Sequence, residues 1–352
     1  MIELQSLLKE AVDKMASDIF ISVGVPPTLK INEQLIKIDD EKLNPEMAKK
    51  MISELFKTEE DFLDFVKAGE KDFSTSLAGI GRFRVAAYIQ RGSMAAAIRV
   101  LRFESLDLGQ LNIPTEILDF HSKKKGLILV TGPTGSGKST TLSAIISLIN
   151  KKRSCHILTL EDPIEYLHKH DKSIVDQREI GIDTKSYSMA LKSALRQAPD
   201  VILIGEMRDY ETVSIALTAA ETGHLVLSTL HTTSAAKTID RIIDVFEPSQ
   251  QQQIRVQLST VLTAVVTQQL LPSIDDSRIP AFEVMIANPN IRNLIREAKI
   301  PQIDAAIQTG RAFGMMSMDM SIANLYNEGK ITKETALAYA VNPEGITKYF
   351  KW

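Results

Sequence analysis

The sequence predicts an α/β protein with two domains: a mixed α/β domain followed by a larger domain built on a parallel sheet. Three observations lead to this fold class. The 352 residues are more than one small core needs, and they suit two domains. From about residue 115 onward, short apolar runs alternate with loops and helical patterns, as in parallel sheets covered by helices. A glycine-rich stretch follows the first of these runs and precedes a helical pattern.

Composition and charge are those of an ordinary globular protein. Hydrophobic residues make up 44% and charged residues 24% of the chain. The 41 basic and 44 acidic side chains nearly cancel, which leaves a formal net charge of -3. Nucleic acids and anionic membranes favour proteins with a basic surplus. We therefore expect no nucleic-acid partner.

The sequence predicts a protein of a reducing compartment. The single cysteine, Cys155, cannot form an internal disulfide, and we expect it to be a small core residue. The N-terminal stretch carries acidic residues on a helical spacing, unlike the basic start and apolar stretch of a signal peptide. No apolar run reaches the length of about 18 residues that a membrane span needs. We expect a cytoplasmic protein with no direct membrane insertion.

The first domain, residues 1–101, is expected to combine helices with antiparallel strands. Apolar residues recur on a helical spacing at the N-terminus, and apolar and polar residues alternate in the strands. Pro45 suits the first turn of a helix, where its missing N–H has no partner to lose. The expected elements are helices at 1–15 and 45–56 and strands at 20–23, 29–31 and within 73–101.

A polar stretch with Gly109 and Pro114 predicts a linker over residues 102–114, so the second domain is expected to cover residues 115–352. Its strands should be near-continuous runs of Ile, Leu and Val, because parallel strands are buried on both faces. The runs that fit lie at 126–132, 156–162, 200–206 and 224–231. From about Ile291 the pattern is mostly helical.

The stretch from Gly132 to Thr141, GPTGSGKSTT, fits the phosphate-loop pattern of glycines followed by a lysine and a hydroxyl residue. Glycines let successive backbone N–H groups turn toward one point, and the following helix directs its positive end there. Lys138 would contact the β- and γ-phosphates of ATP, and Ser139 would bind Mg²⁺. The nucleotide-binding residues expected in the loop are Gly132, Pro133, Thr134, Gly135, Ser136, Gly137, Lys138, Ser139 and Thr140.

Ionisable side chains follow or end the neighbouring predicted strands. Glu161 and Asp162 end one strand, Glu206 ends the next, and His231 ends a third. Ligands of open parallel sheets bind beyond the carboxyl ends of the strands. We therefore expect these side chains to gather where the loop holds phosphate, with Glu161 and Asp162 among the nucleotide-binding residues.

The roles of these residues follow from phosphoryl transfer to water, which needs a metal, a positioned water and positive charge. Glu206 is expected to hold Mg²⁺ through water. Because Gly205 precedes it instead of a second acid, another carboxylate must share the work, and Glu165 is our choice for activating the water. His231 would sense the γ-phosphate; the alternative is a buried structural histidine.

The first domain offers positive charge in Arg82, Arg84 and Arg91. Arg82 and Arg84 alternate with Phe83 and Val85, so one face of this strand is basic and the other apolar. The alternative is an ordinary solvated strand face. The functional interpretation is that the three arginines reach a nucleotide on another subunit as arginine fingers.

A series of motifs runs in order over nearly the whole chain: ASDIFISVGVPP, GIGRFRV, GPTGSGKST, LEDPIEY, LRQAPDVILIGEMRD, AAETGHLVLSTLHTTSAAKTIDRIIDVF and IRNLIREAKIPQI. Their combination closely resembles the PilT-type retraction ATPases of type IV pili. The phosphate loop alone is unspecific, but the stretch around His231 and the IRNLIRE segment are much narrower signals. The resemblance implies ATP hydrolysis coupled to pilus retraction and twitching motility.

The resemblance also implies a PAS-like first domain, a RecA-like second domain and a homo-hexameric ring, with nucleotide between the two domains and beside a neighbour's arginines. Glu161, Asp162 and Glu165 match the family's Asp box, Glu206 its Walker B motif and His231 its His box. Movement of the first domains against the second would turn the pilus platform protein at the cytoplasmic face of the inner membrane, so that pilin subunits leave the fibre base.

Several other functions are weighed against this one. ASDIFISVGVPP and QREIGID also resemble the PilU-type accessory retraction ATPases, a paralogous type that is also an expected partner, whereas GEMRD and IRNLIRE favour the PilT type. An assembly or type II secretion ATPase would be expected to carry extra N-terminal domains and a four-cysteine metal motif. A P-loop kinase would need an acceptor pocket and an arginine-rich lid. A nonhydrolysing scaffold would be expected to lack Lys138, Glu165 or Glu206.

The IRNLIRE segment also has a physical interpretation. Arg292 and Arg296 lie one helical turn apart and share a helix face, with Ile291, Leu294 and Ile295 on another. An ordinary amphipathic helix is the alternative. The resemblance implies that this helix is tied to retraction rather than to ATP hydrolysis.

Overall fold

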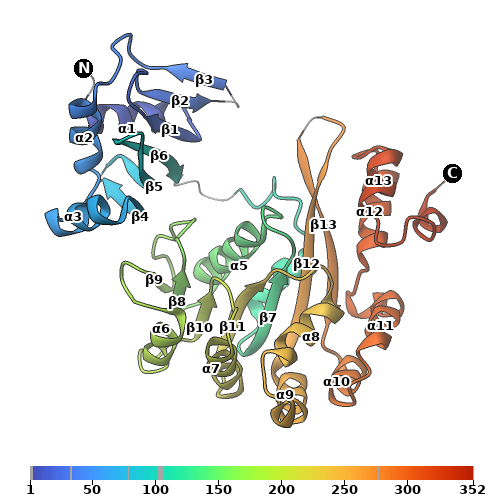
Figure 1. Ribbon diagram of the computed structural model, residues 1–352. Helices are drawn as coiled ribbons and strands as arrows, with labels where there is room; N and C mark the ends of the chain where they lie inside the picture. Colours follow the sequence, from blue (N-terminus) through green and yellow to red (C-terminus); the bar gives the residue numbers. More distant parts are fainter. Residues whose placement is uncertain (1–2, 32–33, 78, 102–106, 276, 352) are drawn as a thin grey trace. The chain divides into compact units, whose positions relative to one another are not determined.

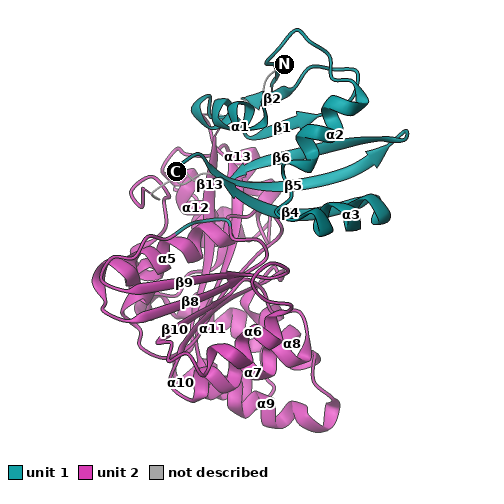
Figure 2. Ribbon diagram, turned by 90° about the vertical axis from the view of Figure 1, so that its left-hand side faces the viewer, with its two compact units in different colours: residues 1–105, 165–167 teal, residues 106–164, 168–352 magenta. Residues whose placement is uncertain are grey.

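The computed structural model describes residues 3–31, 34–77, 79–101, 107–275 and 277–351 of the chain. It divides into two compact units, which Figure 2 colours separately. The N-terminal unit comprises Met1–Ser105 and Glu165–Leu167, and the C-terminal unit comprises Leu106–Ile164 and His168–Trp352. Residues 102–106 of the expected linker lie outside the described ranges, so the domain boundaries at 101 and 114 stay predictions.

Within the described residues, the N-terminal unit contains a six-stranded antiparallel sheet with the order β3-β2-β1-β6-β5-β4 (Figure 1). Its strands are β1 (Asp18–Ile21), β2 (Thr28–Ile31), β3 (Gln34–Lys37), β4 (Glu70–Leu77), β5 (Gly81–Gln90) and β6 (Ser93–Leu101). The antiparallel strands expected within 73–101 are confirmed. Arg91 and Gly92 turn the chain between β5 and β6 with positive φ angles of 49° and 74°.

Three helices of the N-terminal unit, as far as the structure describes it, belong to the same apolar core as the sheet. They are α1 (Leu4–Asp13), α2 (Pro45–Ser53) and α3 (Glu59–Ala68). The expected helix beginning at Pro45 is confirmed, and the Asn44 side chain caps it by accepting a hydrogen bond of 2.9 Å from the backbone N–H of Met47. Phe65 of α3 and Phe83 of β5 are fully buried in this core.

The C-terminal unit contains, in the part that is described, a seven-stranded sheet with the order β13-β12-β7-β11-β10-β8-β9. All neighbouring strands are parallel except β12 and β13, which form an antiparallel pair. The strands are β7 (Gly126–Thr131), β8 (His156–Glu161), β9 (Ile174–Glu179), β10 (Val201–Ile204), β11 (Leu225–Leu230), β12 (Leu262–Pro272) and β13 (Arg278–Ile286). The four expected strands are confirmed as β7, β8, β10 and β11, whereas β9, β12 and β13 were not expected.

Helices cover both faces of this sheet. They are α4 (Thr115–Leu118), α5 (Lys138–Lys152), α6 (Tyr187–Ala194), α7 (Tyr210–Glu221), α8 (Ala235–Asp244), α9 (Pro248–Val261), α10 (Pro289–Arg296), α11 (Ile303–Thr309), α12 (Met318–Asn327) and α13 (Lys333–Tyr339). Ile128 and Val130 of β7 pack in one apolar cluster with α5, and Leu127 and Leu129 pack in another with α6 to α11. Because side chains alternate along a strand, β7 is buried on both faces, and its sequence is continuously apolar.

The β12–β13 hairpin extends the sheet and carries its own helices. Side chains of α12 and α13 pack on the far part of the hairpin around Leu271, Ile279 and Ala281. Figure 1 shows both helices beside the hairpin, toward the C-terminal end of the chain. Among the described residues, no helix combines the length and the apolar character that crossing a bilayer requires.

Candidate active site

The phosphate loop connects the end of β7 to the start of α5. Gly137 is the residue before the helix, with a φ of +88°, and its carbonyl accepts a hydrogen bond of 3.0 Å from the N–H of Thr141. Pro133, Thr134, Gly135 and Ser139 are exposed. The loop therefore presents its tip and the first turn of α5 to solvent, where a ligand can reach them.

Two buried polar groups inside the loop suit a phosphate ligand. The Lys138 ammonium donates to the carbonyl oxygens of Gly132 and Pro133, at 3.0 and 2.9 Å. The Ser136 hydroxyl is buried and has no hydrogen-bond partner among the described residues. A buried hydroxyl without a hydrogen-bond partner destabilises the folded state, and an anion bound in the loop would supply that partner. The residues present thus fit a phosphate-bearing nucleotide.

Glu206 and His231 come together at the carboxyl ends of two neighbouring strands. β10 and β11 run in parallel, Glu206 lies two residues beyond the end of β10, and His231 directly follows β11. One carboxylate oxygen of Glu206 is 3.4 Å from His231 Nε2, and the other is 2.7 Å from Arg208 Nε. The Glu206 side chain is 18% exposed and that of His231 45% exposed, so His231 is not a buried structural histidine.

Arg208 is a site residue that the sequence interpretation missed. The sequence interpretation assigns the positive charge at the nucleotide to arginines of the first domain. The Arg208 guanidinium, however, lies beside Glu206 within the C-terminal unit. Its side chain is 74% exposed, so it is open to ligands as well as to the carboxylate. The signal was its place in the GEMRD motif, two residues after Glu206.

Glu161 is held in place at the end of β8. Its Oε1 atom accepts hydrogen bonds from the Thr159 hydroxyl at 2.6 Å and from the Gln177 side-chain amide of β9 at 3.1 Å. Glu161 is half-buried and the following residue, Asp162, is exposed. Glu161 is therefore oriented by two donors at the end of β8, and Asp162 follows it at the surface.

The loop after these acids is anchored by a carboxylate from the unexpected strand β9. Glu179 is only 2% exposed, and its Oε2 accepts a hydrogen bond of 3.0 Å from the N–H of Ile164. The next residue, Glu165, is exposed and is grouped with the N-terminal unit. Its role in activating water stays a prediction.

Tyr187, at the start of α6, explains why glycine precedes Glu206. A Cβ atom built on Gly205 would lie 2.6 Å from the Tyr187 hydroxyl oxygen, closer than side chains pack. Burial raises the pKa of Tyr187, and the charges of Asp162 and Glu206 raise it further. The phenol is therefore neutral at physiological pH, beside the strand ends that carry the carboxylates.

The three arginines proposed as arginine fingers, Arg82, Arg84 and Arg91, lie on or next to β5. Phe83 and Val85 are fully buried while Arg84 is exposed, so the expected alternation of an apolar and a basic face is confirmed. The half-buried Arg82 donates a long hydrogen bond of 3.4 Å to the Ser76 hydroxyl. Arg91 is exposed in the β5–β6 turn. Their role as arginine fingers stays a prediction.

Arg292 of the IRNLIRE segment caps the C-terminal end of the neighbouring helix α9. Its guanidinium donates to the carbonyl oxygens at the C-terminus of α9, at 2.6 Å to Ser259, 2.5 Å to Thr260 and 2.8 Å to Leu262. Burial lowers the pKa of Arg292. Arg296 is exposed. The two arginines therefore differ in environment, although they are one turn apart in the same helix.

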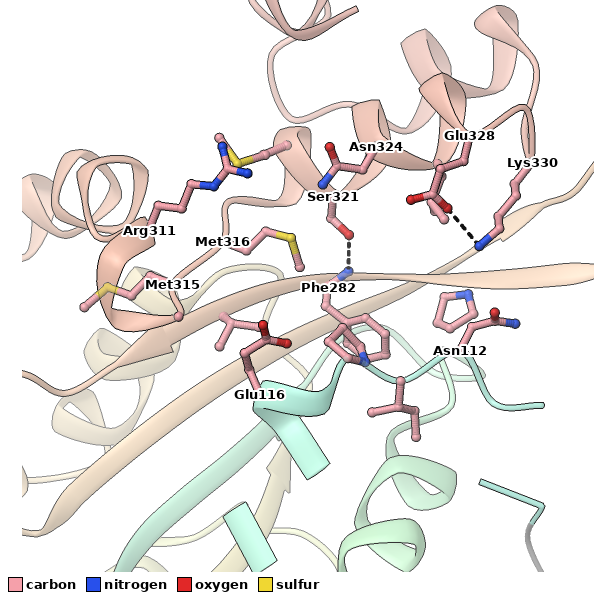
Figure 3. A pocket seen from close by; sticks show the side chains of 17 residues that line it. Asn112, Glu116, Phe282, Arg311, Met315, Met316, Ser321, Asn324, Glu328 and Lys330 are labelled. Carbon is pink, nitrogen blue, oxygen red and sulfur yellow. Dashed lines mark hydrogen bonds and ion pairs between the residues drawn. The ribbon is translucent and has the colours of Figure 1, made fainter. Parts of the chain in front are cut away.

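A cavity of about 460 Å³ lies apart from these residues, between the segment at 112–116, β13 and the C-terminal helices (Figure 3). Phe282 forms part of its apolar wall, and Glu116 and Arg311 are among its polar groups. An ion pair of 2.8 Å between Glu328 and Lys330 lies at one side. Among the described residues that line it, none belongs to the phosphate loop or to the strand ends described above. We therefore place the candidate site by its chemistry, at the phosphate loop.

A metal ion at the carboxyl ends of the parallel strands would take ligands from the bound phosphates as well as from side chains. Among the described residues, no group of three His, Cys, Asp or Glu side chains is arranged to bind a metal ion. Ser139 is exposed at the start of α5, and Glu206 is the nearby strand-end acid expected to bind the metal. This donor set suits Mg²⁺, which keeps several waters and takes further ligands from phosphates.

The known proteins that this chain resembles include pilus ATPases. The chain is 44% identical over 346 residues to the type IV pilus retractation ATPase PilT of Pseudomonas aeruginosa, covering 98% of this chain and 100% of that protein. It is 40% identical over 339 residues to the type IV pilus ATPase PilU of the same organism, covering 96% and 88%. A crystal structure of the pilus retraction motor PilT with bound ADP matches with a TM-score of 0.92 and 45% identity, covering 99% of this chain and 100% of that one.

The fold class is confirmed: the protein is α/β, with a PAS-like N-terminal unit and a RecA-like P-loop unit. The sequence matches the family described as type II/IV secretion system proteins over residues 1–339. The match spans both units, and the full-length relatives above share it with high identity. This chain therefore belongs to the family of type II/IV secretion system proteins.

Proposed function

We propose that this protein is an ATP-hydrolysing motor that powers retraction of type IV pili. One observation carries the proposal. Parallel strands of one sheet lead into the phosphate loop, with its buried lysine and unpartnered serine hydroxyl, and into the Glu206–His231 pair. The chain that carries this arrangement resembles a retraction motor over its full length. The ADP bound to that motor supports a nucleotide as the ligand.

The loop residues and Lys138 would bind ATP, and Ser139 together with Glu206 would bind Mg²⁺. The metal would neutralise charge on the β- and γ-phosphates. An ion pair of 2.7 Å with Arg208 orients the Glu206 carboxylate. The adjacent His231 would sense the γ-phosphate. Glu165 would activate the attacking water, supported by Glu161 and Asp162.

The protein would act as a homo-hexamer at the cytoplasmic face of the inner membrane, at the pilus base. Each nucleotide would lie beside Arg82, Arg84 and Arg91 of a neighbouring subunit, which would supply positive charge to the phosphates during cleavage. Hydrolysis would move the two units of each subunit against each other. That movement would turn the pilus platform protein, so that pilin subunits leave the fibre.

A second candidate is an accessory retraction ATPase that works beside a paralogous one, which the likeness to PilU supports. The two functions differ in what the protein does alone. We expect this chain to restore pilus retraction in a strain that lacks its own retraction ATPase and the accessory one. Restoration that needs the second ATPase would assign the accessory role instead.

The biochemical test is release of inorganic phosphate from ATP and Mg²⁺ without any acceptor, which a motor shows and a kinase does not. Lys138→Ala should abolish nucleotide binding or turnover, and Glu206→Gln should keep binding but stop turnover. Lys151→Ala, an exposed lysine at the other end of α5, is the matched control and should leave both unchanged. A purified wild-type chain that releases no phosphate, or undiminished hydrolysis by Glu206→Gln, would contradict the proposal.

A further inference from the structure

Gln268 is a buried amide in a strand that lies against the phosphate-loop strand. β12 runs parallel beside β7, with Thr267 opposite Thr131, and the hydroxyl oxygens of these two threonines are 3.0 Å apart. The Gln268 residue is only 3% exposed. Glutamine is mostly found at the surface, so a buried one needs polar partners close by.

The oxygen end of this amide holds the start of helix α5. Gln268 Oε1 accepts a hydrogen bond of 2.7 Å from the hydroxyl of Thr141, which is 1% exposed and lies in the first turn of the helix. The N–H of Thr141 in turn donates to the carbonyl of Gly137, at 3.0 Å. The bond therefore joins β12 to the turn that directly follows the phosphate loop.

The nitrogen end and the backbone of Gln268 face the glycines of the loop. A Cβ atom on Gly137 would lie 2.8 Å from Gln268 Nε2, and the backbone carbonyl oxygen of Gln268 approaches Gly132 too closely for any side chain there. Both glycines have positive φ angles, of +88° and +143°. One residue thus packs against the first and the last glycine of the loop, and the loop is held at both ends.

We propose that Gln268 is a positioning residue for nucleotide binding, which holds the phosphate loop in its binding conformation through Thr141 and Gly137. The inference rests on the proposed nucleotide site. A loop that is already in the bound conformation loses less entropy when the ligand enters. Because the contacts that carry this role are with Thr141 and the loop glycines, we expect the contribution of Gln268 to fall on affinity and not on the chemical step.

The test is a double-mutant cycle between Gln268→Ala and Thr141→Val, read out as the dissociation constant of ADP by calorimetry. Each single change should weaken ADP binding roughly three- to tenfold, the loss of about one buried hydrogen bond. The double variant should be no weaker than the weaker single variant, because both changes remove the same bond. In ATP turnover, the KM should rise while kcat stays within about twofold.

Controls separate positioning from general damage. Gln269→Ala is the matched control, since Gln269 is the next residue on β12 and belongs to the opposite side of the strand. Thr141→Ser keeps the hydroxyl and should bind ADP like the wild type. In the nucleotide-free protein, amide hydrogen exchange in the loop should be faster in Gln268→Ala and Thr141→Val than in Gln269→Ala.

The outcomes distinguish this inference from the function on which it rests. If the wild type binds no ADP, the proposed function fails. If the wild type binds ADP but Gln268→Ala and Thr141→Val bind it equally well, or if their effects simply add, only the positioning role is overturned. Should Gln268→Ala not fold, the pair Thr141→Val and Thr141→Ser decides, because equal ADP affinity of those two variants would also overturn it.

Discussion

The packing of Tyr187 against Gly205 predicts that alanine cannot replace this glycine without loss of stability. A Cβ atom at position 205 would lie 2.6 Å from the Tyr187 hydroxyl oxygen, with the carbonyl of Leu160 at 3.3 Å and Glu161 Cα at 3.5 Å. The backbone neighbours leave little room for position 205 to move away. The half-buried tyrosine must therefore shift by several tenths of an ångström.

Overpacking of this kind costs about 1–3 kcal/mol in the free energy of unfolding. For a unit of this size, that corresponds to a fall in the unfolding midpoint of roughly 2–12 °C. Tyr187→Phe removes the oxygen that meets the new Cβ atom. In that background Gly205→Ala should cost less than half as much, so the two changes should show a coupling free energy of about 0.5 kcal/mol or more.

The assay is chemical or thermal unfolding of the four proteins of the cycle, without nucleotide. Gly81→Ala in β5 is the control, because Gly81 has no positive φ angle and its Cβ would meet only ordinary contacts from 3.5 Å outward. It should change stability little. If Gly205→Ala is as stable as the wild type, or costs the same with Tyr and with Phe at position 187, the hydroxyl is not the reason for the glycine.

Three further predictions follow from single side chains. Arg292→Ala should lower the free energy of unfolding by about 2–4 kcal/mol, because it removes charged hydrogen bonds to the end of α9, whereas the exposed Arg296→Ala should change it by less than about 0.5 kcal/mol. Burial raises the pKa of Glu283 from 4.5 to about 7, so the folded state binds this proton more tightly than the unfolded chain does. The free energy of unfolding therefore falls as the pH rises from about 4.5 to about 7. Glu283→Gln should remove up to about 3 kcal/mol of that fall, measured by unfolding experiments across this pH range. Arg84→Ala should leave the unfolding midpoint unchanged and lower ATP turnover of the assembled protein.

Each of these has a contrary result. Equal destabilisation by the two arginine variants would show that Arg292 contributes no more than an exposed residue. An unchanged slope of stability against pH in Glu283→Gln would place the titrating group elsewhere. Turnover per subunit that is the same in the assembled and the unassembled protein would show that no neighbouring subunit contributes Arg84.

How far the sequence predicts this fold depends on how each strand is buried. Strands β7, β8, β10 and β11 were found because parallel strands covered on both faces are continuously apolar. β9 was missed because its sequence, IVDQRE, is mostly polar at the edge of the sheet. β12 was missed because Thr267, Gln268 and Gln269 interrupt its apolar pattern. Those polar residues suit a buried strand only through partners elsewhere in the chain.

The sequence by itself determined the phosphate loop, the lysine and serine within it, and the acids and histidine that follow the strands. These features are local, because a turn, a helix start and a strand end depend on neighbouring residues. Only the tertiary structure decided that Gln268 meets Thr141 across 127 residues, that Arg208 holds Glu206, and that Tyr187 occupies the space beside Gly205. Such contacts depend on which strands and helices become neighbours, and no periodicity in the chain encodes that pairing.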